Sequence, residues 1–119
     1  MSAAPGSPLM THRMGDVQVV EFLETSVLDQ LAIERIRRAI ADLVDKTGVP
    51  KLVISFENVR HISSAMLGVL VSVNKSASAK GGQIRLAGLN DNIAQVFKMT
   101  KLDKVMKIYD SSEKALVKF

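Results

Sequence analysis

Hydrophobic positions in the first half of the chain change from the alternating spacing of strands to the spacing of a helix. Residues 9–13 and 17–22 alternate on either side of a Gly-Asp turn, which predicts a β-hairpin. Ser26 and Asp29 are both candidates for a helix N-cap, because a short side-chain oxygen can accept from the free amides of a first turn. Residues 30–47 have apolar side chains at intervals of three and four, and so predict an amphipathic helix with one buried stripe: Ile33, Ile36, Ile40, Leu43 and Val44.

The second half of the chain alternates predicted strands with predicted helices. Residues 51–56 form a continuous apolar run, which is typical of a central strand covered on both faces. The spacing then predicts helices over residues 65–80, 92–100 and 111–118, with strands over 83–87 and 105–109. In these helices, we expect Leu67, Leu70, Val71, Asn74 and Ser78 on one side of the first, and Ile93, Val96 and Phe97 inward in the second. This order predicts an α/β fold with a mixed, mostly parallel sheet of about five strands and about four helices.

Composition places the chain among ordinary globular domains. Its 119 residues suit one domain with a modest core. No apolar run approaches the roughly 18 residues of a membrane span, so we expect no membrane insertion. Residues 1–8 lack the basic start and apolar stretch of a signal peptide, and we expect them to be a flexible tail before a domain at 9–119. The absence of cysteine fits a reducing cytoplasm.

The net charge of +4 is too mild to indicate a nucleic-acid partner. Single-stranded nucleic acid is bound by basic stripes interleaved with aromatic side chains, but this chain has four phenylalanines, one tyrosine and no tryptophan. Acidic residues also interrupt the basic ones, so solvated helix faces are the better interpretation. We therefore expect no direct contact with nucleic acid.

Few residues here could support catalysis. His61 lies near two serines, but no Gly-x-Ser-x-Gly elbow surrounds either one. The sequence contains no Gly-x-Gly-x-x-Gly or P-loop pattern, and no group of residues with metal-ligand spacing. We expect a protein that is not an enzyme, with no catalytic residue, metal or cofactor.

Ser63 and Ser64 occupy the loop between the predicted central strand and the following helix. They have two interpretations. Ser63 could be the N-cap with Ser64 as the first helical residue, or the pair could present a regulatory hydroxyl. The residues by themselves leave both open.

Residues 62–68, Ile-Ser-Ser-Ala-Met-Leu-Gly, resemble the core motif of the STAS domain of bacterial anti-sigma factor antagonists. That motif reads Asp-Ser-Ser/Thr-Gly-Leu-Gly after an apolar residue. Residues 81–86 and 96–102 also resemble later segments of the family, and the likeness extends from about residue 9 to 119. The chain departs from the pattern at Ser63, where the family has Asp, and at Ala65 and Met66, where it has a second hydroxyl residue and Gly.

The resemblance implies a protein-binding module that sequesters an anti-sigma factor. In the family this partner is also a serine kinase with a histidine-kinase-like ATPase fold, and phosphorylation of the antagonist releases it. By position the phosphorylated residue is Ser64, with Ser63 as the second candidate. We expect the partner contact to be lined by residues of this loop and of the Leu-Asp loop: Asp29, Asn58, Arg60, His61, Ser63, Ser64 and Met66.

Two alternatives stay open. The domain could be an unphosphorylated scaffold that assembles with other STAS proteins in a signalling complex, or a subunit of a lipid transporter. It could also be a module that binds a nucleotide or a lipid.

Overall fold

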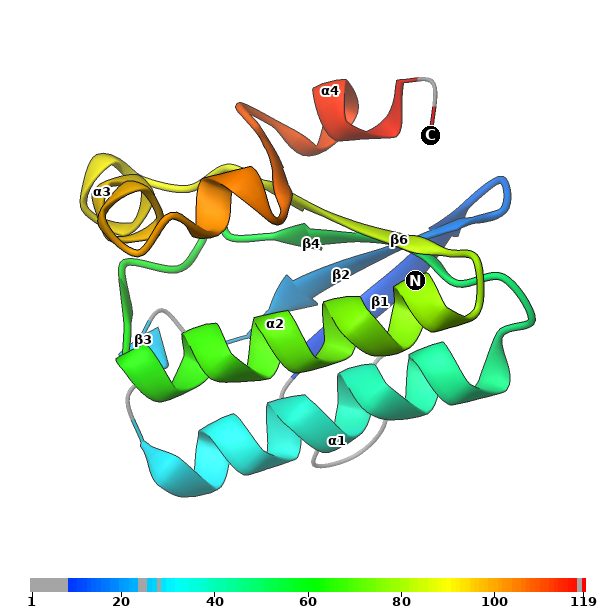
Figure 1. Ribbon diagram of the computed structural model, residues 1–119, viewed down its shortest axis with the longest axis horizontal. Helices are drawn as coiled ribbons and strands as arrows, with labels where there is room; N and C mark the ends of the chain where they lie inside the picture. The colour runs from blue at the N-terminus through cyan, green and yellow to red at the C-terminus, as the bar shows by residue number, and fades with distance from the viewer. Residues whose placement is uncertain (1–8, 24–25, 28, 118) are drawn as a thin grey trace.

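A five-stranded sheet forms the centre of the computed structural model, which describes residues 9–23, 26–27, 29–117 and 119. Helices α1 (Gln30–Lys46) and α2 (Ser64–Ala79) lie side by side on one face, and the short α4 (Ser112–Leu116) lies on the other (Figure 1). The predicted tail at residues 1–8 lies outside the described residues.

The sheet has the order β1-β2-β4-β6-β7. Strands β1 (Leu9–Met14) and β2 (Val17–Phe22) form the predicted antiparallel hairpin. The other neighbours pair in parallel, namely β2 with β4 (Lys51–Ser55), β4 with β6 (Gln83–Ala87) and β6 with β7 (Lys107–Tyr109). The prediction of a central strand is confirmed for β4, whose residues are buried after its first one. The α/β class with a mostly parallel sheet is also confirmed.

A local side-chain cap marks where α1 begins. Asp29 is the N-cap of α1, and its carboxylate accepts a hydrogen bond of 3.2 Å from the Ala32 amide. Ser26 is not a cap, because it belongs to β3 (Ser26–Val27), which pairs in parallel with β5 (His61–Ile62). The sequence does not reveal these two-residue strands, since they are too short to show a period.

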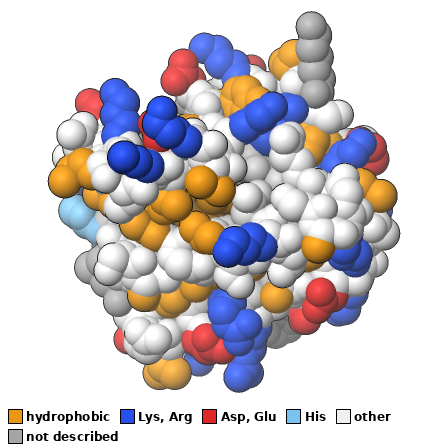
Figure 2. Space-filling model, viewed as in Figure 1, with side chains coloured by type: hydrophobic (Ala, Val, Ile, Leu, Met, Phe, Trp, Pro, Cys, Tyr) orange, Lys and Arg blue, Asp and Glu red, His pale blue; other side chains and the backbone are white. Residues whose placement is uncertain are grey.

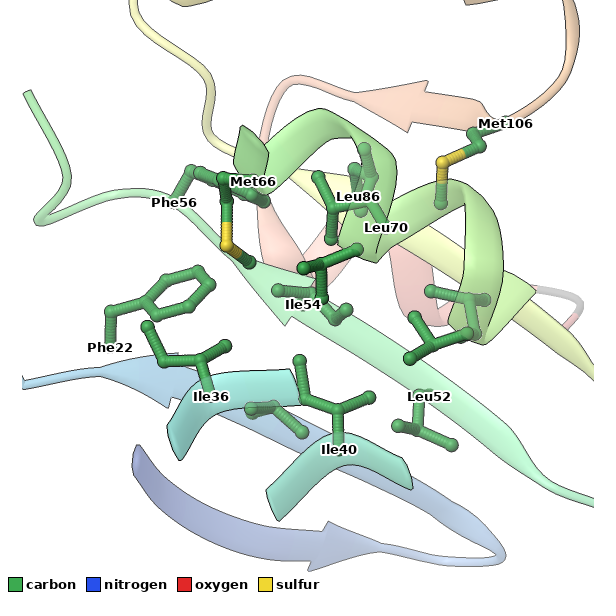
Figure 3. Close-up of a cluster of buried hydrophobic side chains, with 14 of the residues drawn as sticks. Phe22, Ile36, Ile40, Leu52, Ile54, Phe56, Met66, Leu70, Leu86 and Met106 are labelled. Atoms are coloured by element: carbon green, nitrogen blue, oxygen red, sulfur yellow. The ribbon is translucent and has the colours of Figure 1, made fainter. Parts of the chain in front are cut away.

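The main core lies between α1, α2 and the facing side of the sheet (Figure 3). The Phe22 and Phe56 rings pack with their centroids 5.0 Å apart near the beginning of both helices. The predicted stripe of α1 is buried at Ile33, Ile36, Ile40 and Val44, while Leu43 packs against the core from a partly exposed position.

Two details of the predicted second half are wrong. In α3 (Asp91–Met99), Ile93 and Phe97 are buried as predicted, but Val96 is 38% exposed, because its position lies about 100° away from Phe97 around the helix. The last strand begins at residue 107 rather than 105, since a 3₁₀ turn, η1 (Leu102–Lys104), precedes it.

The second, smaller cluster lies between α4 and the opposite face of the sheet. Buried Arg85 of β6 crosses this interface, and its guanidinium donates to the carbonyls of Ala115 at 2.8 Å and Val117 at 3.0 Å. The same guanidinium lies 4.2 Å from the ring centroid of Phe119 and 5.3 Å from that of Tyr109. Arg85 therefore joins the C-terminal segment to the sheet.

Candidate functional site

The loop from Glu57 to Ser63, here called the serine loop, connects the carboxyl end of β4 with α2. Two contacts of its own backbone anchor it. Val59 is only 2% exposed, and its amide donates to the Phe56 carbonyl at 2.9 Å. Strand β5 then pairs with β3, so that the loop is held against the segment that leads into α1. Because of these anchors, the two serines follow a fixed backbone.

Ser63 occupies the N-cap position of α2, as one of the two interpretations predicts. Its backbone is extended, with φ −90° and ψ 163°, and its carbonyl accepts from the Met66 amide at 3.1 Å. Its side chain makes no capping hydrogen bond, however, and its buried hydroxyl oxygen has no partner within the described residues. Ser63 is therefore a cap by backbone geometry alone.

Ser64 is the first residue of α2 and is exposed. At this position its amide is one of those that have no acceptor within the helix, and the positive end of the helix dipole lies beside it. Its hydroxyl is thus presented at the surface in an environment that favours negative charge.

Asp29, the N-cap of α1, lies at the same edge of the molecule as Ser64. Val27 lies opposite Ile62 in the parallel β3–β5 pair. Parallel strands run in the same direction. Asp29 and Ser64, which come two residues after Val27 and Ile62, therefore both follow the same end of this pair. Asn58, Arg60 and His61 are exposed on the serine loop itself.

Met66 is not at the surface, and its predicted place in the partner contact is wrong. Its side chain is 0% exposed and points into the core beside Phe22 and Phe56 (Figure 3). The reason is helical spacing, since Met66 lies on the same face of α2 as the buried Leu70, Val73 and Ala77. The position where the family has Gly is therefore filled here by a core residue.

Helix α3 borders the serine loop, and Asn90 connects the two. The Asn90 side-chain oxygen caps α3 by accepting from the Ile93 amide at 2.8 Å. Its amide nitrogen donates to the carbonyls of Arg60 at 3.1 Å and Val59 at 3.4 Å. Sequence reasoning missed this contact, because an Asn before a helix indicates a cap but does not show what else it binds.

A groove of about 260 Å³ lies between the serine loop and α3. It is lined by Arg60, His61, Ile62, Asn92, Ile93 and Val96. Two predicted contact residues, Arg60 and His61, thus line a hollow together with α3 residues that sequence reasoning did not select for a site. Val96, which was predicted to lie in the core, is one of the residues that line this groove.

His61 makes no hydrogen bond to either serine within the described residues. In that part of the chain, no group of three or more histidine, cysteine, aspartate or glutamate side chains is placed to hold a metal ion. None of the described helices has the length and apolar character needed to cross a membrane.

Comparison with known protein families and curated relatives agrees with this geometry. The STAS domain matches residues 15–115. A Thermotoga neapolitana protein provisionally named an anti-sigma factor antagonist is 38% identical over 69 residues, which span 58% of this chain and 61% of that relative. The anti-sigma F factor antagonist of Paenibacillus polymyxa is 27% identical over 75% of this chain and 76% of its own length.

Solved structures share the fold. The crystal structure of a Thermotoga maritima protein, also provisionally named an anti-sigma factor antagonist, has a TM-score of 0.79 at 27% identity and covers 91% of both chains. The phosphorylated form of the Bacillus cell fate determinant SpoIIAA has a TM-score of 0.70 at 20% identity, covering 91% of this chain and 96% of that one. The order of elements, the serine loop and these matches together show that the chain belongs to the STAS domain family.

Proposed function

We propose that this protein is an anti-sigma factor antagonist, a cytoplasmic binding module whose partner is an anti-sigma factor with serine-kinase activity. In this proposal, the unmodified serine loop binds the partner and phosphorylation of Ser64 releases it. The observation that carries the proposal is the exposed Ser64 at the first position of α2, which follows a loop with several exposed polar residues. The names of the relatives support the same role.

The choice of Ser64 over Ser63 follows from access. A kinase must bring its phosphate donor within bonding distance of the attacking hydroxyl oxygen. The Ser63 oxygen is buried in this structure, whereas Ser64 is exposed. Ser64 can therefore be modified without moving the backbone of the loop.

The switch needs no change of fold. A phosphoserine adds a charge of about −1.5 to −2. At the beginning of α2, the free amides and the helix dipole stabilise that charge within the protein itself. At a protein interface without a cationic partner, the same charge would be desolvated, and a penalty on the order of 3 kcal/mol would weaken binding more than a hundredfold.

The direct test is the intact mass of the protein after incubation with ATP and a purified candidate anti-sigma factor. We expect the addition of one phosphate to the wild type and to Ser63→Ala, and none to Ser64→Ala. We also expect Ser64→Asp to weaken binding of the same candidate, because it places a carboxylate where the phosphate would be. An unmodified wild type whose binding is unaffected by Ser64→Asp would contradict the proposal and favour the unphosphorylated scaffold.

A further inference from the structure

The groove and the serine loop form a single surface. Asn90 fixes the beginning of α3 to the carbonyls of Val59 and Arg60, so that the two walls of the groove are held together. On the α3 side, Asn92, Val96 and Met99 share one helix face, because they are spaced by four and three residues. Met99 is 73% exposed, so this face leaves an apolar side chain in solvent beyond the groove.

Basic side chains surround this apolar surface. Residues 96–107, which include the end of α3 and all of η1, contain four lysines and one acidic residue, Asp103. None of these lysine side chains makes an ion pair within the described residues, whereas Arg37 and Arg38 of α1 both pair with Glu34. Figure 2 shows hydrophobic side chains over α3, η1 and the adjoining edge of α2, with lysine and arginine side chains along their border.

Lys101 has a backbone conformation that is unusual for a residue with a side chain. Its φ of 61° places it in the left-handed region directly after α3, and no other described residue except glycine has a positive φ. Glycine usually follows a helix in this conformation, because a side chain there is strained. Backbone strain of this kind is enriched at functional sites.

We propose that this groove and the basic corner formed by the end of α3 and η1 bind an acidic, amphipathic segment of the anti-sigma factor. The inference rests on the proposed function and adds the chemistry of the partner to it. Apolar side chains of the segment would lie against Ile62, Val96 and Met99. Its carboxylates would face Arg60 and Lys101, since interfaces place opposite charges together.

Two other anionic partners fit the surface less well. The phenylalanines that could stack on nucleic-acid bases are buried at positions 22, 56 and 97, and Phe119 packs against Arg85. The chain also has no tryptophan, the residue that commonly anchors proteins at a membrane interface. A protein segment that supplies both apolar and acidic side chains fits this surface better than either of them.

An acidic partner also explains the direction of the switch. Ser64 comes two residues after Ile62 in the chain, and Arg60, His61 and Ile62 line the groove. A phosphate there would repel the partner's carboxylates and compete with them for the same cations. Release on phosphorylation then follows from charge alone.

The first experiment maps the surface without the natural partner. A synthetic amphipathic helical peptide of leucine and glutamate is titrated into the ¹⁵N-labelled protein, and amide shifts are recorded by NMR. We expect shifts confined to residues 60–62 and 92–104, and none of comparable size with the lysine version of the peptide. Shifts elsewhere, or larger effects with phosphatidylserine vesicles or single-stranded DNA, would overturn the inference.

The second experiment uses variants and the anti-sigma factor that passes the phosphorylation test. Lys101→Gly should relieve the backbone strain and keep or raise the melting temperature, yet weaken binding by about tenfold. Arg60→Glu should weaken binding further, while Lys46→Glu at the far end of α1 changes the net charge equally and should have no effect. If Lys101→Gly and Arg60→Glu both bind the anti-sigma factor as tightly as the wild type, the groove is not its binding site. The Ser64→Asp result decides the proposed function separately.

Discussion

At the scale of single residues, two positions in the family motif have opposite environments. Met66 is fully buried and belongs to the core, although the motif has glycine there. Gly68 is exposed in the second turn of α2, and a Cβ built on it would meet no atom within 4 Å. Nothing in the described fold therefore requires glycine at 68, and glycine weakens a helix by roughly 0.5–1 kcal/mol relative to alanine.

This contrast gives a prediction for Gly68→Ala. The substitution should raise the free energy of unfolding by about 0.5–1 kcal/mol, because it adds helix propensity at an open site. It should also weaken binding of the anti-sigma factor, since residue 68 lies one turn after Ser64 on the same side of α2. Urea unfolding and a binding titration measure the two effects.

The matched control is Ser78→Ala, an exposed position near the other end of α2. It should leave binding unchanged, with at most a small gain in stability. If Gly68→Ala binds as tightly as this control, the exposed face of α2 lies outside the interface.

At the scale of elements, the site depends on short connections between longer ones. The β3–β5 pair holds the serine loop beside the start of α1, and Asn90 holds it beside the start of α3. Each connection involves only one or two residues. The arrangement of the site therefore depends on these few contacts more than on the size of any helix.

Two variants of Asn90 should separate its two roles. Asn90→Ala removes both the cap and the donor to the loop, and should lower stability by about 1–3 kcal/mol. Asn90→Asp keeps an oxygen to cap α3, but replaces the donor that faces the carbonyls of Val59 and Arg60.

Amide hydrogen exchange can distinguish the two effects. Exchange in the serine loop should rise in both variants, whereas exchange in the first turn of α3 should rise only in Asn90→Ala. Equal protection of the loop in Asn90→Asp and the wild type would show that the side-chain amide does not hold the loop.

At the scale of the whole molecule, the two faces of the sheet are covered unequally. Two long helices cover one face and carry the serine loop, while the five-residue α4 covers part of the other. Arg85 stabilises the smaller layer by donating to backbone carbonyls at the end of α4 and beyond it. The C-terminal segment should thus be able to loosen without disturbing the site.

Arg85→Ala tests this division. It leaves the carbonyls of Ala115 and Val117 without their donor, and should lower stability by about 2–4 kcal/mol, including the lost packing against two rings. Hydrogen exchange should rise in α4 and β7 and stay unchanged in α2. Arg85→Lys keeps the charge but loses the planar guanidinium group, and should lower stability by less. Equal loss of protection in α2 would show that the two layers unfold as one.

The sequence by itself determined most of the elements, because their hydrophobic periods extend over many residues. The stripe from Ile33 to Val44 and the continuous run in β4 were sufficient for a helix and a central strand. The capping position of Ser63 followed from the same pattern. The resemblance of residues 62–68 to the STAS motif predicted the family, which the match over residues 15–115 confirms.

Only the tertiary structure decided which side chains of that loop are accessible. Ser64 and Ser63 are adjacent and chemically identical, yet one is exposed and the hydroxyl oxygen of the other is buried. Met66 belongs to the core and Val96 to the groove, the reverse of what was predicted for each. The physical reason is that accessibility depends on what the neighbouring elements cover, and contacts such as the β3–β5 pair and the Asn90 bridge join segments far apart in the chain.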